Sequence, residues 1–372
     1  MFCIIVKITY GGGGIDKITV IYRGYDNRKL EIDNEKIVHE TQLPLSKFDV
    51  FNLFISTYLC KKSNPFLCFA SPELKKINEI LKNASAIIIS PSGANIGIYQ
   101  DERLLGLLVL AIRKKLRPIF CYCTIGRSKS RLFNFISKFA LRKSALYLRE
   151  KRSMEYARKI GAKAEFGIDR AFYFQPDRSF GIPTDIKGLF IGDNKPIVLI
   201  LTELHNWHPD FRGKYDDVTA LNDCIIPAIE NLANKYKKDI VLLPHIIGET
   251  ERIFLCSIIE AVSKEIGERI YLADINSVYE YDNIINGAEI VVTMRYHGVV
   301  ISAKNGVPFL AIAYENKMLE VSRYVNCAEN CIFIADLIKD NSLFEQKLNY
   351  CYDHSNEIKD KLFEFRNKYG IK

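Results

Sequence analysis

Apolar runs of strand length alternate with amphipathic stretches over most of this chain, most clearly from residue 73 onward. Such alternation predicts the strands and helices of an α/β fold. In the first half we expect helices over 73–83, 101–115 and 129–142, a further helix that Ser153 caps and Gly161 ends, and strands over 86–89, 119–123, 145–148 and 164–168. Because strands and helices take turns, these strands should form a parallel sheet with helices on both faces.

Between residues 181 and 194 Pro and Gly residues interrupt the alternation, which then begins again. In the second half we expect strands over 197–201, 240–243, 269–272, 290–294 and 307–313, and helices over 218–236, 250–265, 277–286 and 298–304. Residues 335–368 follow as charged amphipathic helices.

This pattern divides the chain into three segments. They are an N-terminal α/β domain over 1–185, a C-terminal α/β domain over 186–335 and a C-terminal helical segment over 336–372. Two successive doubly wound, Rossmann-like domains predict the glycosyltransferase B-type arrangement, with the ligand cleft between the two halves. The length of 372 residues agrees with two domains, because a single core rarely grows so large.

The net charge of +8 and the pI near 8.8 indicate anionic partners. A phosphorylated substrate, an acidic glycan, a membrane surface and nucleic acid all fit, and charge alone does not choose among them. Basic residues are concentrated between Arg113 and Arg158, where few acidic residues occur. This concentration predicts a basic face on the N-terminal domain.

The sequence predicts a cytoplasmic protein. No run reaches the 18 apolar residues of a membrane-spanning helix, and no charged region precedes an apolar one at the N-terminus. The ten cysteines form no Cys-x-x-Cys pair, which is typical of free thiols in a reducing compartment. Cys327 and Cys331 lie close together, but no second pair completes a metal site, so we expect no metal ion and no cofactor.

The most informative motif follows the predicted strand 290–294. It contains Arg295, His297 and Gly298, and Lys317 follows the next predicted strand. A strand-helix-strand unit is parallel, so these side chains should emerge at the carboxyl ends of adjacent strands, where open α/β sheets bind ligands. A lone His after a strand is more often structural, but convergence with Arg and Lys favours a site for phosphate or carboxylate.

Three other strand ends carry candidate residues. Arg149 ends the strand 145–148, and a surface Arg paired with Glu150 or Glu155 is the equal alternative. Gly93 and Asn95 lie in the loop after the strand 86–89, where backbone donors could hold an anion or a sugar hydroxyl, and a plain structural turn is the alternative.

The loop after the strand 197–201 contains Trp207, the only Trp of the chain. We interpret it as a stacking platform for a sugar ring, with a packed structural Trp as the equal alternative. His205 and His208 flank it, but Pro209 makes this segment a loop, so a metal pair is not expected. His245 ends the next strand and is a weaker candidate for contact with an acceptor.

The motifs resemble those of the polysaccharide pyruvyltransferases. The resemblance rests on the Arg-x-His-Gly turn at 295–298, the Gly-Val-Pro strand start at 306–308 and the Tyr-x-x-Lys ending at 314–317. It spans about residues 85–335 and is strongest over 288–323. In this chain Arg170 stands where the family usually has Pro, Ser92 replaces a glycine, and the family's opening Asn-x-Gly turn is not found in Met1 to Gly14.

The resemblance implies transfer of the pyruvyl group of phosphoenolpyruvate to two hydroxyls of one sugar in a cell-surface polysaccharide or its precursor. The products are a cyclic ketal and free phosphate. Carried onto this sequence, the catalytic residues are His297, Arg149 and Lys317. The donor-binding residues are Arg295, Arg149, Lys317 and Gly298, and the acceptor-binding residues are Trp207, His245, Gly93 and Asn95.

The expected partners are therefore phosphoenolpyruvate and a sugar or oligosaccharide acceptor, free or lipid-linked, and not nucleic acid. A lipid-linked acceptor would bring the protein to the inner face of the cell membrane as a peripheral protein. Two alternative functions remain besides pyruvyl transfer. One is a nucleotide-sugar-dependent glycosyltransferase of the same architecture, and the other is a non-catalytic protein whose basic face binds polyanions.

Overall fold

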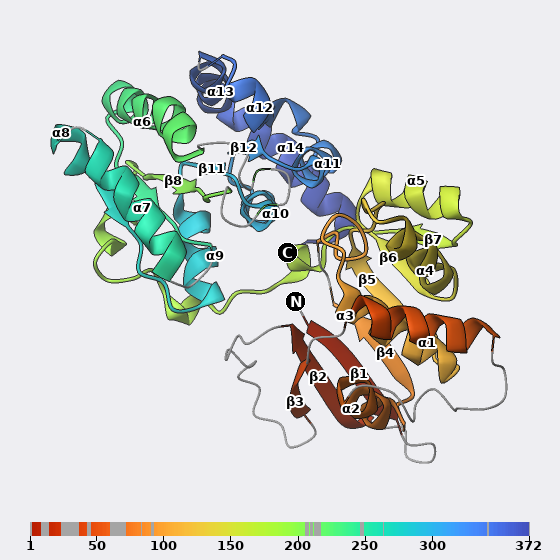
Figure 1. Ribbon diagram of the computed structural model, residues 1–372. Coiled ribbons are helices and arrows are strands. Elements are labelled where there is room, and N and C mark those ends of the chain that lie inside the picture. Colours follow the sequence, from red (N-terminus) through yellow and green to blue (C-terminus); the bar gives the residue numbers. More distant parts are fainter. Residues whose placement is uncertain are drawn as a thin grey trace. The chain divides into compact units, whose positions relative to one another are not determined.

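The computed structural model shows a chain that divides into two compact units, Met1–Arg170 and Ala171–Lys372 (Figure 1). The structure describes residues 2–8, 15–23, 37–42, 46–59, 72–82, 84–90, 93–204, 208, 211, 217–245, 249–262, 264–340 and 342–371. Each unit has its own β-sheet and its own helices, as the sequence predicted for an α/β fold. None of the described helices is both long and apolar enough to cross a membrane.

The first unit is built on a seven-stranded sheet with the order β3-β2-β1-β4-β5-β6-β7. Its strands are β1 (Phe2–Ile8), β2 (Ile15–Arg23), β3 (Ile37–Gln42), β4 (Ala86–Ile89), β5 (Ile119–Cys123), β6 (Ala145–Leu148) and β7 (Ala164–Phe166). Strands β4 to β7 pair in parallel, as the alternation predicted. Strand β1 is antiparallel to β2 and β4, so the whole sheet is mixed. Only residues 9–14 separate β1 from β2, too few for a parallel crossover.

The helices described in this unit are α1 (Lys47–Leu59), α2 (Pro72–Leu81), α3 (Glu102–Arg113), α4 (Arg131–Arg142) and α5 (Lys151–Ile160). The sequence did not predict α1, because its aromatic and β-branched residues are weak helix formers. A reciprocal cap starts it, since Asp49 N donates to Ser46 Oγ (3.1 Å) and Ser46 N donates to Asp49 Oδ2 (3.0 Å). Helix α1 packs along α3, whose residues 104–111 are all buried.

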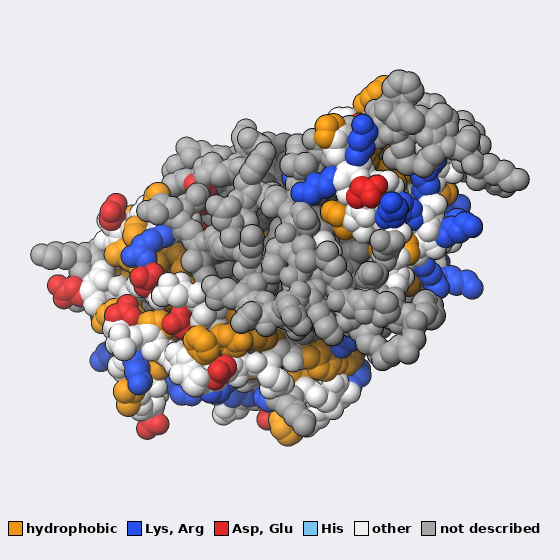
Figure 2. Space-filling model, turned by 90° about the horizontal axis from the view of Figure 1, so that it is seen from below, with side chains coloured by type: hydrophobic (Ala, Val, Ile, Leu, Met, Phe, Trp, Pro, Cys, Tyr) orange, Lys and Arg blue, Asp and Glu red, His pale blue; other side chains and the backbone are white. Residues whose placement is uncertain are grey.

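The basic residues of this unit lie mostly at its surface. Those that are exposed between Arg113 and Arg158 are Lys115, Arg117, Arg127, Lys129, Arg131, Arg142, Lys143, Lys151, Arg152 and Arg158. In Figure 2 the first unit is on the right, and blue Lys and Arg side chains there outnumber the red acidic ones. Arg149 is the exception, because it is buried.

The second unit contains a six-stranded sheet with the order β10-β9-β8-β11-β12-β13. Its strands are β8 (Ile197–Ile200), β9 (Ile240–Leu242), β10 (Ile270–Leu272), β11 (Ile290–Thr293), β12 (Phe309–Ala313) and β13 (Cys331–Phe333). All pairs in this sheet are parallel. The chain builds outward first on one side of β8 and then on the other, so the strand order reverses between β8 and β11. In such sheets the ligand crevice lies outside the carboxyl ends of the strands at this switch point.

The main helices of this unit correspond to the predicted ones. The described helices are α6 (Asp217–Tyr236), α7 (Glu249–Ala261), α8 (Lys264–Gly267), α9 (Val278–Gly287), α10 (Tyr296–Asn305), α11 (Asn316–Tyr324), α12 (Ile334–Leu337), α13 (Ser342–Asp353) and α14 (Ser355–Tyr369). The expected helix 250–265 is divided into α7 and α8. Helix α11 and the three-residue β13 carry too short a pattern to be recognised. Single 3₁₀ turns are η2 (Arg170–Tyr173), η3 (Arg178–Phe180), η4 (Lys187–Phe190) and η5 (Ala328–Asn330).

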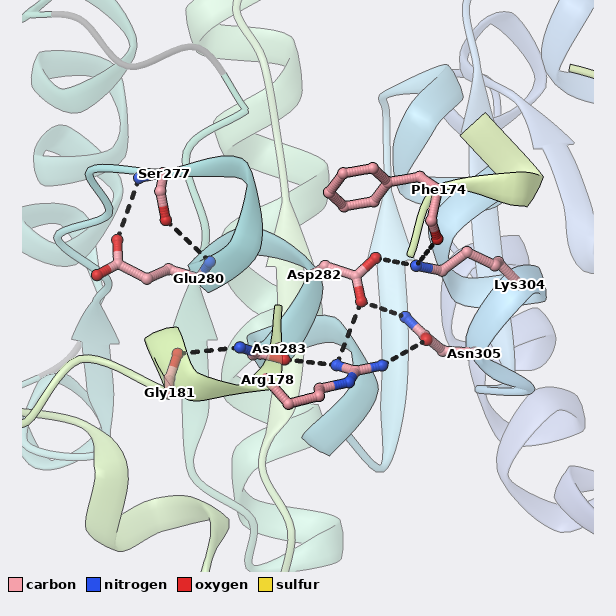
Figure 3. Close-up of polar contacts among 9 residues, drawn as sticks. All are labelled: Phe174, Arg178, Gly181, Ser277, Glu280, Asp282, Asn283, Lys304 and Asn305. Carbon is pink, nitrogen blue, oxygen red and sulfur yellow. Dashed lines mark hydrogen bonds and ion pairs between the residues drawn. The ribbon is translucent and has the colours of Figure 1, made fainter. Parts of the chain in front are cut away.

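Residues 171–185, which the sequence pattern grouped with the N-terminal domain, lie in the second unit. A buried polar network holds them there (Figure 3). The Asp282 carboxylate is fully buried and pairs with Arg178 Nη1 at 3.3 Å and with Lys304 Nζ. Lys304 Nζ also donates to Phe174 O (3.3 Å). The Pro and Gly residues after 181 therefore follow the anchored segment, and do not mark the point where the units divide.

The C-terminal helical segment also belongs to the second unit. Phe365 of α14 is buried and its ring contacts Phe172 with centroids 5.0 Å apart. Tyr173 Oη donates to Tyr369 O (3.2 Å). These contacts join the last helix to the residues that open the unit.

Candidate functional site

The turn from β11 into α10 brings the helix very close to the sheet. Arg295 is the residue before the helix, and its backbone N donates to Thr293 Oγ1 (2.9 Å). A Cβ atom at Gly298 would lie 2.9 Å from Thr293 Cβ and 3.2 Å from Ile200 Cδ1. Only glycine leaves room for this approach. The first backbone N–H groups of α10 therefore start at the ends of β8 and β11, the switch point of the sheet.

Three predicted residues lie at this edge of the second unit. Arg295 and His297 follow β11, and Lys317 lies in the first turn of α11 after β12. Strands β11 and β12 are parallel neighbours, so both turns are at the same edge. Arg295 is buried, and His297 is partly exposed.

His245 is the centre of this cluster. Its ring stacks on that of His297, with centroids 5.8 Å apart and planes inclined by 21°. Its Nδ1 lies 3.0 Å from Tyr281 Oη. Burial, followed by the positive charges of Arg295, His297 and Lys317, lowers the pKa of His245 well below its ordinary value. The cluster thus combines a neutral imidazole with a set of surrounding cations.

A carboxylate that the sequence did not reveal orients Arg295. Glu251 Oε1 accepts from Arg295 Nη2 (2.6 Å), and Glu251 Oε2 accepts from the backbone N of His245 (2.7 Å). Both side chains of the ion pair are buried. One carboxylate therefore fixes the guanidinium and the His245 loop together. An acidic residue in the first turn of a helix is common, so no local signal marked Glu251.

A second carboxylate holds Lys317 in the same way. Glu315 Oε2 lies 3.0 Å from Lys317 Nζ, and Glu315 Oε1 lies 3.0 Å from His208 Nε2. His208 is buried, and its ring packs on those of Tyr314 and Phe211. The sequence suggested no role for His208 other than that of a metal ligand, which Pro209 made unexpected. Within the described part of the chain, no three His, Cys, Asp or Glu side chains are grouped as a metal site. Trp207 and His205 lie outside the described residues.

We expect the second unit to lose stability at low pH because of His245. Its pKa in the folded chain is far below the ordinary 6.5, so the unfolded chain binds a proton that the folded chain excludes. The free energy of unfolding should fall as pH drops below about 6.5 and should not depend on this residue above it. Urea unfolding at several pH values measures this, and His245→Gln should flatten the profile. The exposed His354 provides the control, and a wild-type profile in His245→Gln would contradict the expectation.

In the first unit the loops after β4 and β5 pair at the carboxyl edge of the sheet. Gly126 N donates to Ile96 O (2.9 Å), and Asn95 N donates to Gly93 O (2.7 Å). Asn95 is buried and Gly93 is partly exposed. The Asn95 backbone donor is thus already used inside the turn, which favours the structural alternative for that N–H.

The prediction that Ser153 caps a helix is wrong. Helix α5 begins after Glu150, and Ser153 lies inside it. Ser153 Oγ instead donates to Ile125 O (2.9 Å) and accepts from Ile125 N (3.0 Å). Its hydroxyl is therefore committed to the loop after β5, and not to the first turn of its own helix.

Arg149 follows β6 directly, as predicted. Its guanidinium forms a buried ion pair with Asp169, a partner that the sequence did not suggest. Glu150 accepts a hydrogen bond from Thr124 Oγ1. Arg149 belongs to the first unit, whereas Arg295, His297 and Lys317 belong to the second. Its joint action with them stays a prediction.

Chemically, the edge of the second sheet suits a small anion. Arg295 can form paired hydrogen bonds to a planar or tetrahedral oxyanion, Lys317 supplies a point charge, and the start of α10 offers backbone donors. His297 adds an imidazole, a side chain that can serve as an acid or a base. This combination of side chains suits a phosphate or carboxylate that lies next to an imidazole.

Comparisons with known proteins agree with this description. A family model described as polysaccharide pyruvyl transferase matches residues 17–316. No curated protein sequence matches the chain. Among solved structures, a Listeria monocytogenes protein assigned as a UDP-N-acetylglucosamine 2-epimerase is similar with a TM-score of 0.56 and 11% identity, covering 88% of this chain and 77% of that one.

Two further structures have the same architecture. The UDP-GlcNAc 2-epimerase from Methanocaldococcus jannaschii has a TM-score of 0.51 and 13% identity, covering 85% of this chain and 84% of that one. An E. coli structure described as trehalose-6-phosphate bound with UDP-2-fluoro glucose has a TM-score of 0.50 and 11% identity, covering 93% and 88%. At such identities the likeness establishes the fold alone. That fold is the glycosyltransferase B type with two Rossmann-like domains, as predicted.

Proposed function

Because the chain belongs to the polysaccharide pyruvyl transferase family, we propose that it moves the pyruvyl group of phosphoenolpyruvate onto two hydroxyls of one sugar. The products are a cyclic ketal and free phosphate. The observation that carries the proposal is the cluster at the switch point of the second sheet. There Arg295, His297 and Lys317 surround His245 closely enough to act on its charge. Such a set of cations beside an imidazole suits a donor with a carboxylate and a phosphate.

The reaction needs a proton at one carbon and a leaving phosphate at the next. Protonation of the methylene carbon makes its neighbour electrophilic, one sugar hydroxyl adds there, and the bond to phosphate breaks. The second hydroxyl then closes the ring. Of the two hydroxyl protons, one balances the proton taken by carbon and the other leaves with phosphate. His297 is our candidate for carrying these protons, as acid and then as base.

The donor contacts follow from the same edge. We assign Arg295 and Lys317 to the oxyanions of phosphoenolpyruvate, with the backbone at Gly298 contributing donors at the start of α10. Glu251 and Glu315 hold the two cations in place. These carboxylates leave the site less positive than the sequence indicated, so the donor must compete with them for hydrogen bonds.

The acceptor is a sugar or oligosaccharide of a cell-surface polysaccharide or its precursor. Trp207 remains a proposed stacking platform, and Gly93 and Asn95 remain proposed contacts in the first unit. His245 stacks on His297, so it would lie at the reacting centre as much as at the acceptor. The free cysteines among the described residues support a reducing, cytoplasmic location.

Calorimetric titration of the full chain tests the donor before any acceptor is known. We expect phosphoenolpyruvate to bind, and Lys317→Met to weaken that binding by about tenfold or more, since one charge-assisted contact is lost. A chain that binds a nucleotide sugar and does not bind phosphoenolpyruvate would overturn the proposal.

That outcome would favour a nucleotide-sugar-dependent glycosyltransferase. One observation supports this alternative, because the similar E. coli structure is described as bound with UDP-2-fluoro glucose. Arg295, Lys317 and the start of α10 would also suit a diphosphate. Phosphate release from phosphoenolpyruvate, compared with nucleotide release from a sugar donor, separates the two functions.

We expect Arg149→Lys to weaken phosphoenolpyruvate binding by about tenfold while the first unit stays folded. Lysine keeps the charge that pairs with Asp169, but a point charge cannot replace the planar fork of donors. Calorimetry measures the affinity, and urea unfolding measures the stability. The exposed Arg152, three residues away on α5, gives the matched control Arg152→Lys. Unchanged affinity in Arg149→Lys would remove Arg149 from the donor site.

A further inference from the structure

The first unit exposes apolar side chains near the start of two neighbouring helices. They are Phe48 (72% exposed) and Phe51 (37%) of α1, and Leu132 (44%) and Phe135 (60%) of α4. The two helices touch, because the Phe54 ring of α1 contacts the ring of Phe135, with centroids 5.5 Å apart, and that of Phe139, at 5.3 Å. These four exposed side chains form the apolar patch.

The apolar patch is separate from the faces that α1 and α4 bury in the core. Each helix already buries another face, through Val50 and Leu53 in α1 and through Phe133 and Ile136 in α4. Within each helix the two patch residues are three positions apart, so they share one face. Large apolar side chains grouped on a surface mark a place of interaction.

Basic residues surround the patch. The segment 127–143 contains six of them and no acidic residue; they are Arg127, Lys129, Arg131, Lys138, Arg142 and Lys143. Arg127, Lys129 and Arg131 are exposed and lead directly into Leu132. Two acidic groups lie near on the α1 side. Asp49 accepts a hydrogen bond from Ser46 Oγ. Burial raises the pKa of Glu102, and the nearby charge of Lys47 partly opposes that rise. The surface as a whole stays positive.

The patch lies at the carboxyl edge of the first sheet. Helix α4 begins after β5 ends there. Arg113 Nη1, at the end of α3, donates to Ser56 Oγ, late in α1, at 2.7 Å. Lys47, the first residue of α1, is also close enough to Glu102, the first residue of α3, to act on its pKa. The two helices therefore begin at the same end, where α3 follows the loop after β4. That loop contains Gly93 and Asn95, the proposed acceptor contacts.

We propose that this surface docks the protein on a membrane that contains anionic lipid. The apolar patch would enter the boundary between headgroups and acyl chains, and the basic residues would contact the headgroups. A second copy of the same surface is a poorer partner, since a two-fold dimer would place like charges opposite each other. Single-stranded nucleic acid is also a poorer partner. Leu132 offers no ring to stack, and the Phe135 ring meets Phe54 nearly edge to face, at 78°.

This inference deepens the proposed function, because docking beside the acceptor loop would bring a lipid-linked acceptor to the site. It rests on that function only for the identity of the acceptor. Docking is measured without donor or acceptor, so its failure would leave pyruvyl transfer untouched.

The test is co-sedimentation of the full chain with vesicles of phosphatidylcholine alone or mixed with phosphatidylglycerol. We expect binding to the anionic vesicles to be at least about tenfold stronger, and to weaken at high salt. Phe48→Ser should lower binding to both kinds of vesicle. The double variant Lys129→Glu with Arg131→Glu should abolish the preference for anionic lipid.

Matched controls come from the second unit. Ile191 is 72% exposed, like Phe48, and Phe363 is 60% exposed, like Phe135. Ile191→Ser and Phe363→Ser should bind vesicles as the wild type does. Phe48→Ser removes only an exposed side chain, so it tests the patch even if Phe135→Ser disturbs the packing on Phe54.

Three results would overturn the proposal. They are equal binding to neutral and anionic vesicles, wild-type vesicle binding by Phe48→Ser, and vesicle binding that a single-stranded oligonucleotide or an acidic protein removes at equal charge concentration. A dimer in light scattering that Phe48→Ser dissolves, without any vesicle binding, would assign the patch to self-association instead.

Discussion

Replacing His297 with alanine should reduce pyruvyl transfer by about 10²–10⁴-fold, the usual contribution of a positioned proton carrier. The chain should stay folded, because His297 is partly exposed and its ring lies beside those of His245 and Tyr296. Arg295, Lys317 and the start of α10 remain, so affinity for phosphoenolpyruvate should change far less than turnover. Phosphate release from phosphoenolpyruvate measures the first quantity and calorimetry the second.

The controls separate chemistry from structure. His354→Ala removes an exposed imidazole far along the chain, on the turn before α14, and should leave turnover unchanged. Circular dichroism and urea unfolding should match between His297→Ala and the wild type. Near wild-type turnover in His297→Ala would end the assignment. Loss of binding without loss of turnover at saturating donor would turn His297 into a donor contact.

The non-catalytic alternative predicts a different response to the same variant. A protein that only binds polyanions through the basic residues of the first unit should keep salt-sensitive binding when His297 is removed. It should also release no phosphate from phosphoenolpyruvate. The variant therefore distinguishes an enzyme from a polyanion-binding protein in one experiment.

The alternation of apolar and polar segments was enough to predict most of the fold. Strands of four or five residues such as 86–89 and 119–123 are continuous apolar runs, and turn residues bound them. The direction of β1 was not predictable in this way, since periodicity marks a strand without giving its partner. Helix α1 was not predicted because its sequence resembles a strand-forming segment, and its helical form depends on packing over α3.

The candidate site was predictable where its residues are close in sequence. Arg295, His297 and Lys317 come from one strand-helix-strand unit, so topology alone placed them together. Glu251 and His208 were not predictable, because they meet Arg295 and Glu315 across 44 and 107 residues respectively. Such partners depend on which strands become neighbours, and the strand order reverses between them. Arg149 and Asp169, by contrast, follow the neighbouring parallel strands β6 and β7, so topology alone brings them to one edge.

The largest effect on stability is expected from Asp282→Ala, at about 3–5 kcal/mol in the free energy of unfolding of the second unit. Asp282 is fully buried and pairs with Lys304, whose side chain is also buried. Burial lowers the pKa of Lys304, and the hydrogen bond to Asp282 opposes that shift. Without the carboxylate the ammonium group is left without this buried counter-charge. Urea unfolding measures the loss, and limited proteolysis between residues 171 and 185 should become faster as the segment is released.

Matched variants show whether charge pairing is the cause. Arg178, which is about half exposed, also pairs with Asp282, and Arg178→Ala should cost no more than about 1 kcal/mol because water replaces much of that contact. The double variant Asp282→Ala with Lys304→Met should recover part of the loss, since it removes both buried charges. If the double variant is as unstable as Asp282→Ala, then packing and not the unpaired ammonium group limits the stability. If Asp282→Ala unfolds like the wild type, this network does not anchor residues 171–185, and the contacts of Phe172 and Tyr173 with α14 must do so.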